Sequence, residues 1–356
     1  MVKREVNKIE TKHGILNLPN FAPDATRAGV RGLPSKFLRN AGVEVAVVIT
    51  YLLMLKPGAD LIEQADGVHS FMNVDFSLVS DSGGYQVFSL VHKNKDLGEV
   101  TDEGVKFKNV YNGDWEFLSP EKSIEIQMKL CTDIMVLLDD VRPNDREKSE
   151  MQEAVERTIA WANRAKNEYL KHIKKRSLQG KVRPKLVAVI QGGPYKDLRK
   201  SCAEGLLAIE DGNFKFDGFG FGGSHLGQGG QVDKEIVEYV SNLIPPDRFA
   251  FALGVGRIED IAFMKSVGWQ LFDCTIPTRE ARHGKVFVKQ GDKIENFNLK
   301  NAKYKEDFEP IDKTCSCGCS NYSKAYLHHL LNVGDFGAFL ILQRHNLKVY
   351  VEFVRS

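Results

Sequence analysis

Two aspartates of the chain stand at the ends of short apolar runs, where they could work on one substrate. Asp81 comes directly after residues 78–80, and Asp273 comes directly after residues 271–272. Two carboxylates on different strands of one pocket can displace a group at an acetal-like carbon, because one attacks the carbon while the other moves a proton. The sequence therefore predicts displacement chemistry where these strands end, and because Asp139 and Asp140 also stand at a strand end, the spacing leaves open which aspartates take part.

Further polar residues and glycines end other apolar runs and could bind a flat ligand. Asp139 and Gln191 could hydrogen-bond the edge of a purine, and glycines let the backbone approach it closely. Tyr85, about one turn after Asp81, could stack on a base, although half-buried packing accounts for it equally well. These run-ending residues are Asp139, Asp140, Gln191, Gly222, Gly223 and Gly254.

Three cysteines close together in the last part of the chain predict a metal site. Six cysteines in a chain of this length, three of them crowded together, are typical of metal binding in a reducing compartment rather than of a disulfide framework. Cys315, Cys317 and Cys319 with one imidazole would make a closed tetrahedral zinc site, structural because no position stays open for water. The histidines that could complete it are His328, His329 and His345.

The formal charge of the chain is +2, from 49 basic and 47 acidic residues, and by itself gives no sign of a nucleic-acid partner. From Arg279 to Ser356, however, there are 13 Lys and Arg against 9 Asp and Glu, so the positive excess lies after Asp273. Arg279 and Arg282 stand close to that aspartate, where they could bind the phosphates of a nucleic acid. The local count therefore restores a nucleic acid as a candidate partner.

Eight short apolar runs alternate with helix-length segments, which predicts βαβ units and a parallel sheet. The runs are residues 18–25, 45–50, 78–83, 133–140, 186–192, 216–222, 249–256 and 271–275. The helices expected include residues 121–131, 151–172, 196–210, 233–243 and 258–267. Eight such units over roughly 250 residues are typical of a (β/α)8 TIM barrel, whose strand ends meet at one active-site face. The expected fold class is thus α/β, in a single domain of residues 1–356.

No segment of the sequence is expected to enter a membrane. The longest apolar run, residues 43–55, is interrupted and too short to cross a bilayer. The first residues lack the apolar core of a signal peptide. The protein is therefore expected in the cytoplasm.

Several strings of residues that include these candidates are long enough to indicate a family. They include Ser80-Asp-Ser-Gly-Gly-Tyr85 and Phe272-Asp-Cys-Thr-Ile-Pro-Thr-Arg279, within residues 80–90, 119–127, 189–192, 254–256, 272–279, 301–304 and 321–329. On these strings the chain resembles the queuine/archaeosine tRNA-guanine transglycosylases, from about residue 8 to residue 350. The resemblance implies a (β/α)8 barrel with an inserted zinc-binding subdomain at about residues 300–350.

The resemblance implies a pentosyltransferase that exchanges the wobble guanine of tRNAs with GUN anticodons for a 7-deazaguanine base, in the queuosine pathway. Asp273 matches the nucleophile that attacks C1′ of the ribose and forms a covalent aspartyl–ribose intermediate. Asp81 matches the general acid and base, and Tyr85 the residue that stacks on the base. The residues that would bind the base are Tyr85, Asp139, Asp140, Gln191, Gly222, Gly223, Leu253 and Gly254.

The resemblance also implies partners and a cofactor. Arg279 and Arg282 match positions that hold the anticodon loop of tRNA, from which the target nucleotide is flipped. Guanine and a 7-deazaguanine base are the small-molecule partners, and a homodimer is expected. His345 matches the distal zinc ligand of the family. The implied ligands of one structural Zn²⁺ per chain are Cys315, Cys317, Cys319 and His345.

The chain departs from the family pattern at several places. The family usually has Cys-x-Cys-x-x-Cys where this chain has Cys-x-Cys-x-Cys, so Cys319 must reach the metal from one residue closer. Val48-Ile49-Thr50 replaces the usual Gly-Asn-Thr and removes an amide expected near Asp81. Leu226 should crowd the cyclopentenediol of queuine, whereas the Asp139-Asp140 pair is closer to the eukaryotic, queuine-using form. The identity of the inserted base therefore stays open.

Two other functions stay open beside base exchange in tRNA. One is a non-catalytic tRNA-binding subunit of a transglycosylase, and the presence of both Asp81 and Asp273 counts against it. The other is insertion of a 7-deazaguanine base into DNA, which related enzymes perform. Without the family resemblance, a barrel glycosidase would be the alternative, because paired carboxylates alone do not name the leaving group.

Overall fold

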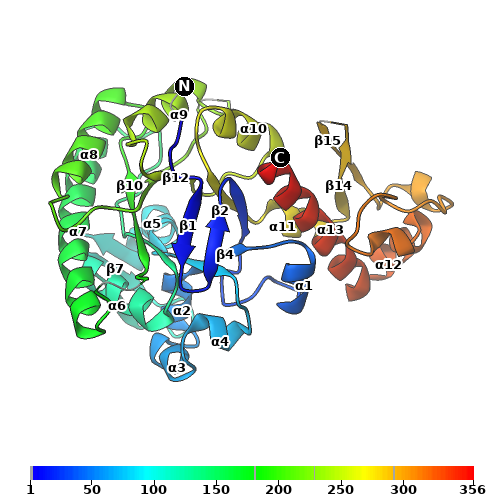
Figure 1. The fold of residues 1–356 in the computed structure, drawn as a ribbon, viewed down its shortest axis with the longest axis horizontal. Coiled ribbons are helices and arrows are strands. Elements are labelled where there is room, and N and C mark those ends of the chain that lie inside the picture. Colours follow the sequence, from blue (N-terminus) through cyan, green and yellow to red (C-terminus); the bar gives the residue numbers. More distant parts are fainter. Residues whose placement is uncertain (1–2, 180–181, 228, 292) are drawn as a thin grey trace.

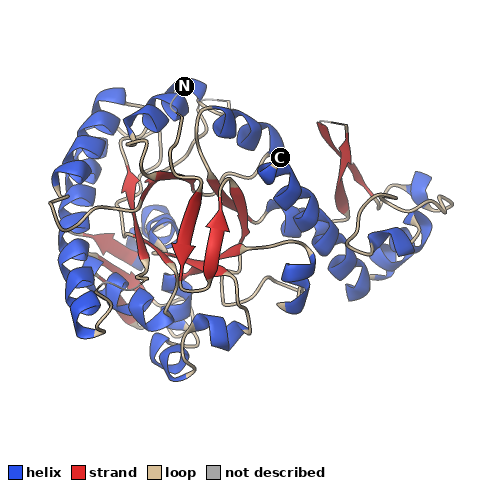
Figure 2. Ribbon diagram, in the orientation of Figure 1, coloured by secondary structure: helices blue, strands red, loops and turns tan. Residues whose placement is uncertain are grey.

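A parallel β-sheet of eight strands forms the centre of the computed structural model, which describes residues 3–179, 182–227, 229–291 and 293–356 (Figures 1 and 2). The strands are β3 (Asn20–Pro23), β4 (Val45–Ile49), β5 (Ser77–Asp81), β9 (Ile134–Val136), β10 (Lys185–Ile190), β11 (Gly218–Phe221), β12 (Phe249–Ala252) and β13 (Leu271–Cys274). Their order in the sheet is β3-β13-β12-β11-β10-β9-β5-β4. The edge strands β3 and β4 meet through a parallel bridge between Asp24 and Val47. The sheet is thus nearly closed, and the predicted (β/α)8 barrel is confirmed.

Helices surround the sheet, as Figure 2 shows. The five helices predicted from the sequence are α6 (Pro120–Leu130), α7 (Lys148–Lys175), α8 (Lys196–Ala208), α9 (Lys234–Leu243) and α10 (Ile258–Ser266). Ser119 caps α6 by accepting a hydrogen bond from the Lys122 N–H over 3.1 Å, and Pro120 occupies the first turn, where its missing N–H costs nothing. Apolar side chains at helical spacing on α7, such as Ala154 and Trp161, are buried and face the barrel.

The connections before β9 are shorter or more irregular than the later ones. They contain α1 (Lys36–Asn40), α2 (Thr50–Leu55), α3 (Ala59–Gln64), α4 (Val68–Met72) and α5 (Gly84–Lys93). Between α5 and α6 lies a three-stranded antiparallel sheet of β6 (Gly98–Val100), β7 (Val105–Lys108) and β8 (Trp115–Leu118). This sheet has no counterpart among the predicted elements, because strands of three or four residues are too short for an alternating pattern to stand out in the sequence.

After the last barrel strand, the chain builds a separate group of packed elements, on the right in Figure 1. They are α11 (Ile276–Arg282), β14 (Lys285–Gln290), β15 (Lys293–Asn298), the 3-10 turns η2 (Ala302–Tyr304) and η3 (Cys319–Asn321), α12 (Lys324–Val333) and α13 (Phe336–Arg355). They share a second hydrophobic core that includes Leu299, Leu327 and Leu342. The C-terminal half of α13 packs against the barrel instead. There the buried Tyr350 hydroxyl donates a hydrogen bond to the Gly256 carbonyl over 3.0 Å. This helix therefore joins the second core to the loop after β12.

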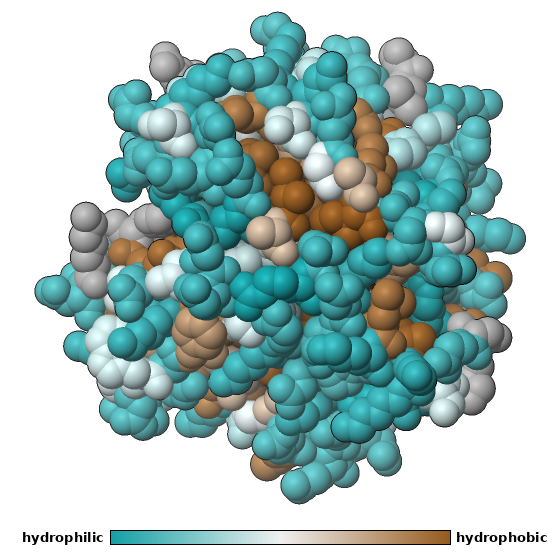
Figure 3. Space-filling model, turned by 90° about the vertical axis from the view of Figure 1, so that its left-hand side faces the viewer, coloured by the Kyte–Doolittle hydropathy of each residue, from teal (hydrophilic) through white to brown (hydrophobic). Residues whose placement is uncertain are grey.

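The outer surface over α7 and α8 is mostly polar. Figure 3 looks onto the side where α7 and α8 lie in Figure 1, and hydrophilic residues cover most of it, with apolar ones gathered in a hollow above its centre. Among the described residues, no helix combines the length and the apolar character that crossing a membrane would need.

A hairpin covers the end of the barrel at which the strands begin (Figure 1). Its strands are β1 (Lys8–Thr11) and β2 (Gly14–Asn17). Asp133, just before β9, binds ring nitrogens of His13 in the hairpin turn over 2.8 Å and of His69 in α4 over 3.0 Å. The same carboxylate accepts a hydrogen bond from the Leu78 N–H over 2.9 Å. One buried carboxylate thus ties the hairpin, α4 and two barrel strands together.

The pKa of Asp133 links this cluster to stability. Burial by itself raises the pKa, but the hydrogen bond and charge of His69, with the bonds from Leu78 and His13, outweigh burial and lower it. A carboxyl with a lowered pKa stabilises the fold above its ordinary titration range, and this contribution is lost as the pH falls through its folded pKa, below about 4.

We expect Asp133→Asn to lower the free energy of unfolding at neutral pH by about 2 kcal/mol, because the charged acceptor of three hydrogen bonds is lost. Urea unfolding of both proteins across the acid range measures this. The difference between them should shrink below about pH 4, where the wild-type carboxyl takes up a proton. Glu238→Gln, an exposed change on α9, is the control and should have almost no effect. A difference that does not change with pH would contradict the assignment.

Candidate functional site

Asp81 and Asp273 end two strands at the same end of the barrel, called the mouth below. Asp81 is the last residue of β5, and its Oδ1 accepts a hydrogen bond from the Gly83 N–H over 3.3 Å. Asp273 lies near the end of β13, and its Oδ1 accepts one from the Gly254 N–H over 2.9 Å. Both side chains are partly buried. The structure therefore brings the predicted pair of carboxylates to one face of the barrel.

The two carboxyls have raised pKa values. Burial raises the pKa of Asp81 to about 6, with the Gly83 N–H opposing it and the charge of Asp24 adding to it. Burial raises the pKa of Asp273 to about 8, with the Gly254 N–H opposing it and the charges of Asp81 and Asp24 adding to it. Like charges in one site resist ionising together, so the pair titrates as a unit. Near neutral pH the two carboxyls share about one proton, which equips the site with one base or nucleophile and one acid.

Asp139 and Gln191, predicted to bind the edge of a purine, lie beside one another at the mouth. Gln191 Nε2 donates to Asp139 Oδ2 over 2.5 Å, and both side chains are buried. Gly222 lies so close that a Cβ on it would stand 2.6 Å from the Gln191 Cδ, and Gly223 follows at the same edge. Burial raises the pKa of Asp139 to about 7, against the hydrogen bond from Gln191 and with two neighbouring aspartates adding to it. The pair offers both donors and acceptors to a flat polar ligand.

Asp140, predicted as a base-binding residue beside Asp139, is fully buried among other partners. Its carboxylate pairs with Arg142 Nη2 over 3.0 Å and with Arg157 Nη1 over 2.6 Å. Its backbone N–H donates to Thr158 Oγ1 over 3.1 Å. Since Arg157 and Thr158 belong to α7, the contacts of Asp140 hold that helix against the segment that follows β9. Asp139 is therefore the member of the Asp139–Asp140 pair that contacts the amide of Gln191.

The remaining predicted base-site residues lie around the same mouth. Tyr85 is in the first turn of α5 and is 66% exposed, so the alternative of half-buried packing is wrong. Leu253 follows β12 and packs on β11, where a Cβ on Gly220 would stand 2.9 Å from the Leu253 Cδ1. Gly254, which follows Leu253, donates its backbone N–H to the carboxylate of Asp273.

Two side chains that the sequence analysis did not single out hold the loops of this site. Arg199 of α8 is fully buried, and it donates through Nε to the Gly193 carbonyl and through Nη1 to the Gly222 carbonyl, each over 2.9 Å. Asn144 Nδ2 donates to the Leu226 carbonyl over 3.2 Å and to a second carbonyl of the same loop. An arginine on the buried face of a helix, next to a glycine-rich strand end, is the sequence signal that could have pointed to Arg199.

Asp24 is a further carboxylate at the mouth that the sequence analysis did not identify. It directly follows β3, and its charge acts on both Asp81 and Asp273. The sequence contained a sign of this role. Asp24 falls near the end of the predicted strand 18–25, just as Asp81 and Asp273 fall near the ends of their predicted strands.

Arg279 and Arg282, predicted to bind a nucleic-acid backbone, lie in α11 directly after β13. The Arg279 side chain is about half exposed, and its Nε pairs with Glu280 over 3.3 Å. Arg282 Nη1 donates to Gln343 Oε1 over 3.4 Å. Burial lowers the pKa of Arg282, and the charges of Arg31 and Arg279 lower it further. Three guanidinium groups thus lie close to one another at the helix that follows β13, an arrangement suited to phosphates.

Cys315, Cys317, Cys319 and His345 form a group whose ligand atoms all lie within 4.8 Å of one another. The sulfur of Cys319 is 3.3 Å and that of Cys317 is 4.0 Å from His345 Nδ1. His345 Nε2 lies 2.7 Å from the Phe287 carbonyl, which accepts its proton and leaves Nδ1 free to face the sulfurs. Hydrogen bonds from Cys315 and Cys319 lower the pKa of the Cys317 thiol. The group can therefore bind a metal ion as a Cys3His set.

The shortened cysteine spacing does not keep the three sulfurs apart. Gly318 has φ +87°, a left-handed conformation that suits glycine, and turns the chain into η3 so that Cys319 comes back to its partners. A Cβ at this position would stand 2.9 Å from Arg344 Nη2. His328, one of the alternative ligands, instead bonds the Leu299 carbonyl through Nδ1 over 2.6 Å. The structure thus groups the cysteines with His345, as the family resemblance implied.

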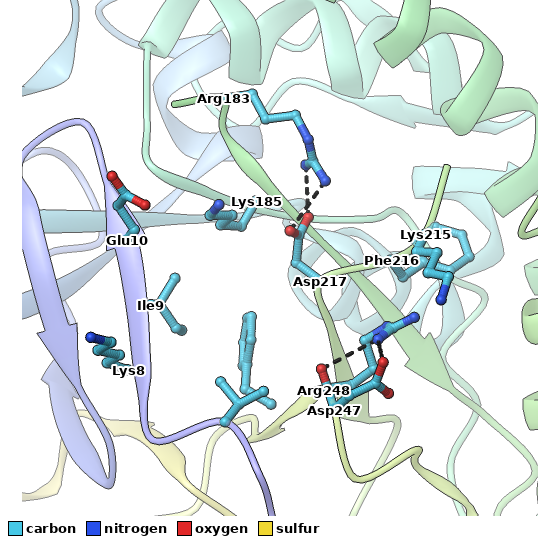
Figure 4. Close-up of a pocket in the computed structure, with 12 residues that line it drawn as sticks. Lys8, Ile9, Glu10, Arg183, Lys185, Lys215, Phe216, Asp217, Asp247 and Arg248 are labelled. Carbon is cyan, nitrogen blue, oxygen red and sulfur yellow. Dashed lines mark hydrogen bonds and ion pairs between the residues drawn. The ribbon is translucent and has the colours of Figure 1, made fainter. Parts of the chain in front are cut away.

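A pocket of about 240 Å³ lies at the opposite end of the barrel, between the β1–β2 hairpin and the starts of β10, β11 and β12 (Figure 4). Arg183 pairs there with Asp217 over 2.8 Å, and Arg248 pairs with Asp247. These ion pairs neutralise much of the charge of the pocket within the protein. The predicted displacement pair lies instead at the mouth, which is the end of a barrel where the carboxyl ends of the strands usually carry catalytic groups.

Comparison with known proteins agrees with this geometry. The family model described as queuine tRNA-ribosyltransferase matches residues 3–356. The chain is 36% identical over 355 residues to the queuine tRNA-ribosyltransferase of Caldanaerobacter subterraneus subsp. tengcongensis, an alignment that covers 99% of this chain and 89% of that protein. It is 37% identical over 343 residues to the protein of the same name from Bacillus subtilis, covering 96% and 84% of the two chains.

Proposed function

Because the chain belongs to the queuine tRNA-ribosyltransferase family, we propose that it exchanges the wobble guanine of tRNAs with GUN anticodons for a 7-deazaguanine base. It is a pentosyltransferase enzyme. The observation that carries the proposal is that one barrel mouth holds both the Asp81–Asp273 pair and the Asp139–Gln191 pair. The first pair has the groups for displacement at a sugar carbon, and the second has the groups for holding the base.

Asp273 has the higher pKa of the pair, about 8 against about 6 for Asp81, so the shared proton lies mainly on Asp273 and the reactive form is the one in which this proton has moved to Asp81. In that form, in the first half of the reaction, the Asp273 carboxylate attacks C1′ of the target ribose. The bond between C1′ and the guanine nitrogen breaks, and Asp81 gives its proton to the leaving base. The product is an ester between Asp273 and the ribose, with tRNA covalently attached. The hydrogen bond from the Gly254 N–H orients the attacking carboxylate.

In the second half, the 7-deazaguanine base takes the place of guanine. Asp81, now a carboxylate, accepts the proton from the ring nitrogen of the incoming base, and that nitrogen attacks C1′. The ester bond breaks, Asp273 is released as a carboxylate, and Asp81 is protonated again. The intermediate pKa of Asp81, about 6, suits a group that both gives and accepts a proton near neutral pH.

The same residues are proposed to bind the leaving base first and the incoming base afterwards. Asp139 and Gln191 hydrogen-bond the edge of the base, and Gly222 and Gly223 let the backbone approach it. The exposed ring of Tyr85 stacks on its face. Asp140 supports this group by holding α7 in place.

The arginine cluster is the tRNA-binding part of the proposal. Arg279 and Arg282, with Arg31 beside them, bind phosphates of the anticodon loop and leave the target nucleotide free to flip into the mouth. The family membership also supports a homodimer and a cytoplasmic location, which we include in the proposal.

Exchange of labelled guanine into unmodified tRNA of the GUN class tests the proposed reaction. The wild type should incorporate the label, and Asp273→Ala should lower the rate by about 1,000-fold or more, because the nucleophile is removed. The control variant Glu238→Gln, an exposed change on α9, should catalyse exchange at the wild-type rate. Exchange retained by Asp273→Ala, or label entering duplex DNA rather than tRNA, would contradict the assignment; no exchange at all would favour a non-catalytic subunit.

The pH dependence of kcat/KM should be bell-shaped, with limbs near pH 6 and pH 8, as expected from the pKa values of about 6 and about 8 for Asp81 and Asp273. Below the lower value both carboxyls are protonated and none can attack. Above the higher value both are ionised and none can protonate the leaving base. Initial rates between about pH 5 and pH 9 measure this, and a rate that rises steadily across that range would rule out the shared proton.

We further propose that the Cys3His group binds one structural Zn²⁺ per chain. Three thiolates and one imidazole are a ligand set that zinc prefers, and the four ligands leave no open position for a reactive water. The bound ion would hold Cys315, Cys317 and Cys319 against His345 of α13 and so stabilise the second core. It takes no part in base exchange.

Metal analysis of the purified protein should find about one zinc per chain. Cys319→Ala should lose most of this zinc and unfold at a lower temperature, because three ligands hold the ion far less tightly. Cys131→Ala, a partly exposed cysteine outside the group, is the matched control and should keep the zinc. Equal metal content in the wild type and Cys319→Ala would contradict the site.

A further inference from the structure

Asp24 faces the interior of the mouth on the same side of the sheet as Asp273. In the register of β3 and β13, Ala22 pairs with Asp273. Residues that pair across parallel strands point to one face of the sheet, and so do residues two apart on one strand. Since Asp24 stands two residues after Ala22, its carboxylate shares the inner face with that of Asp273.

The other neighbour of β3 places Asp24 in the same way relative to Asp81. Asp24 bridges Val47 of β4, and Val47 is two residues before Ile49, which pairs with Asp81. Asp24 and Asp81 thus also share the inner face. The charge of Asp24 raises the pKa of Asp81, as this closeness requires.

One oxygen of the Asp24 carboxylate is held and the other is free. The Thr26 N–H donates to Oδ1 over 2.7 Å, and the Thr26 hydroxyl donates to the same oxygen. Within the described chain, Oδ2 accepts no hydrogen bond, and the side chain is partly exposed to the mouth. Asp24 is therefore an oriented acceptor with one vacant oxygen.

The strand order separates a base side from a sugar side of the mouth. The base-binding pair follows β9 and β10, whereas β3 and β4 lie across the barrel from them. Asp273 on β13 and Asp81 on β5 stand between these two sides. A nucleotide whose base contacts β9 and β10 and whose C1′ contacts Asp273 has its ribose directed toward β3 and β4. The end of β4 there is the apolar Ile49, so of these two strand ends it is that of β3 that presents a charged side chain, Asp24, to the sugar.

We propose that Asp24 binds the 2′-hydroxyl of the target ribose through Oδ2 and so makes the enzyme select RNA over DNA. The inference rests on the proposed function, because it places C1′ of the target nucleotide against Asp273. The 2′-hydroxyl is carried by the carbon next to C1′, and it is the group that tells RNA from DNA. A carboxylate is a strong acceptor for it, and a site built to bind a hydroxyl rejects an analogue that lacks one.

The test uses two anticodon stem-loop RNAs of the GUN class, one entirely ribose and one with a single 2′-deoxy substitution at the wobble guanosine. Both base exchange and equilibrium binding are measured. In the wild type, the deoxy substitution should lower kcat/KM by about 10- to 100-fold, as for loss of a hydrogen bond to a charged group. Asp24→Ala should lower kcat/KM for the all-ribose RNA by a similar factor, and the deoxy substitution should then have no further effect.

Two variants guard against effects of folding. Asp24→Asn keeps the shape of the side chain and a neutral acceptor, so its discrimination between the two RNAs should lie between those of the wild type and Asp24→Ala. Asp247→Asn removes a carboxylate from the pocket at the opposite end of the barrel (Figure 4) and should discriminate as the wild type does. Thermal unfolding and zinc content of all variants should match those of the wild type.

The outcomes separate this inference from the proposed function. If exchange occurs and Asp24→Ala discriminates against the deoxy RNA as strongly as the wild type, the ribose contact is wrong and base exchange stands. The contact is equally overturned if the wild type does not discriminate, or if Asp24→Ala changes only the pH profile. If no protein exchanges the base but discrimination in binding is lost in Asp24→Ala, the ribose contact stands and the proposed reaction is wrong.

Discussion

The gathering of several carboxylates at one partly buried mouth is the constraint on which the rest of the structure depends. Burial and mutual repulsion both oppose ionisation, and they raise the pKa values of Asp81, Asp139 and Asp273. Hydrogen-bond donors such as the N–H groups of Gly83 and Gly254 and the amide of Gln191 offset this only in part. The site therefore keeps protons at neutral pH, which paired carboxylates need if one is to attack and another is to protonate. A mouth with more donors would hold the same aspartates as inert anions.

Such a cluster has to be held by contacts that span the whole chain. Asp24 and Asp273 become neighbours only because the first and last strands of the barrel pair, and α13 then packs against β3 and bonds the loop after β12 through Tyr350. The buried Arg199 side chain hydrogen-bonds two loops at strand ends, and the Asp140 carboxylate holds α7 through an ion pair. The reactive groups themselves thus lie on short strand ends, while buried ion pairs and hydrogen bonds set their positions.

The sequence was sufficient to predict the barrel and to bring Asp81 and Asp273 to one end of it, because both depend on local patterns. Each strand is a short apolar run, and Asp81 and Asp273 stand at strand ends within long family strings. It could not separate Asp139 from Asp140, because their roles depend on Arg157, an ion-pair partner 17 positions away on a helix. The strands β6 to β8 were missed since they are too short to show a period. The choice of His345 came from the family resemblance, and its free Nδ1 is set by a carbonyl on β14 that no spacing could indicate.

In the proposed function, the negative mouth and the positive segment after β13 are compatible because a tRNA would present different groups to each. The phosphates carry the charge of the nucleic acid, and the cluster of Arg31, Arg279 and Arg282 lies where they can bind. The part of the target nucleotide that enters the mouth, a ribose and a base, is neutral, so the carboxylates do not repel it. Screening limits each field to about 10 Å at moderate ionic strength, which keeps the two regions distinct. The nearly balanced total of +2 therefore conceals two opposite surfaces, and the proposed chemistry on a flipped nucleotide uses both.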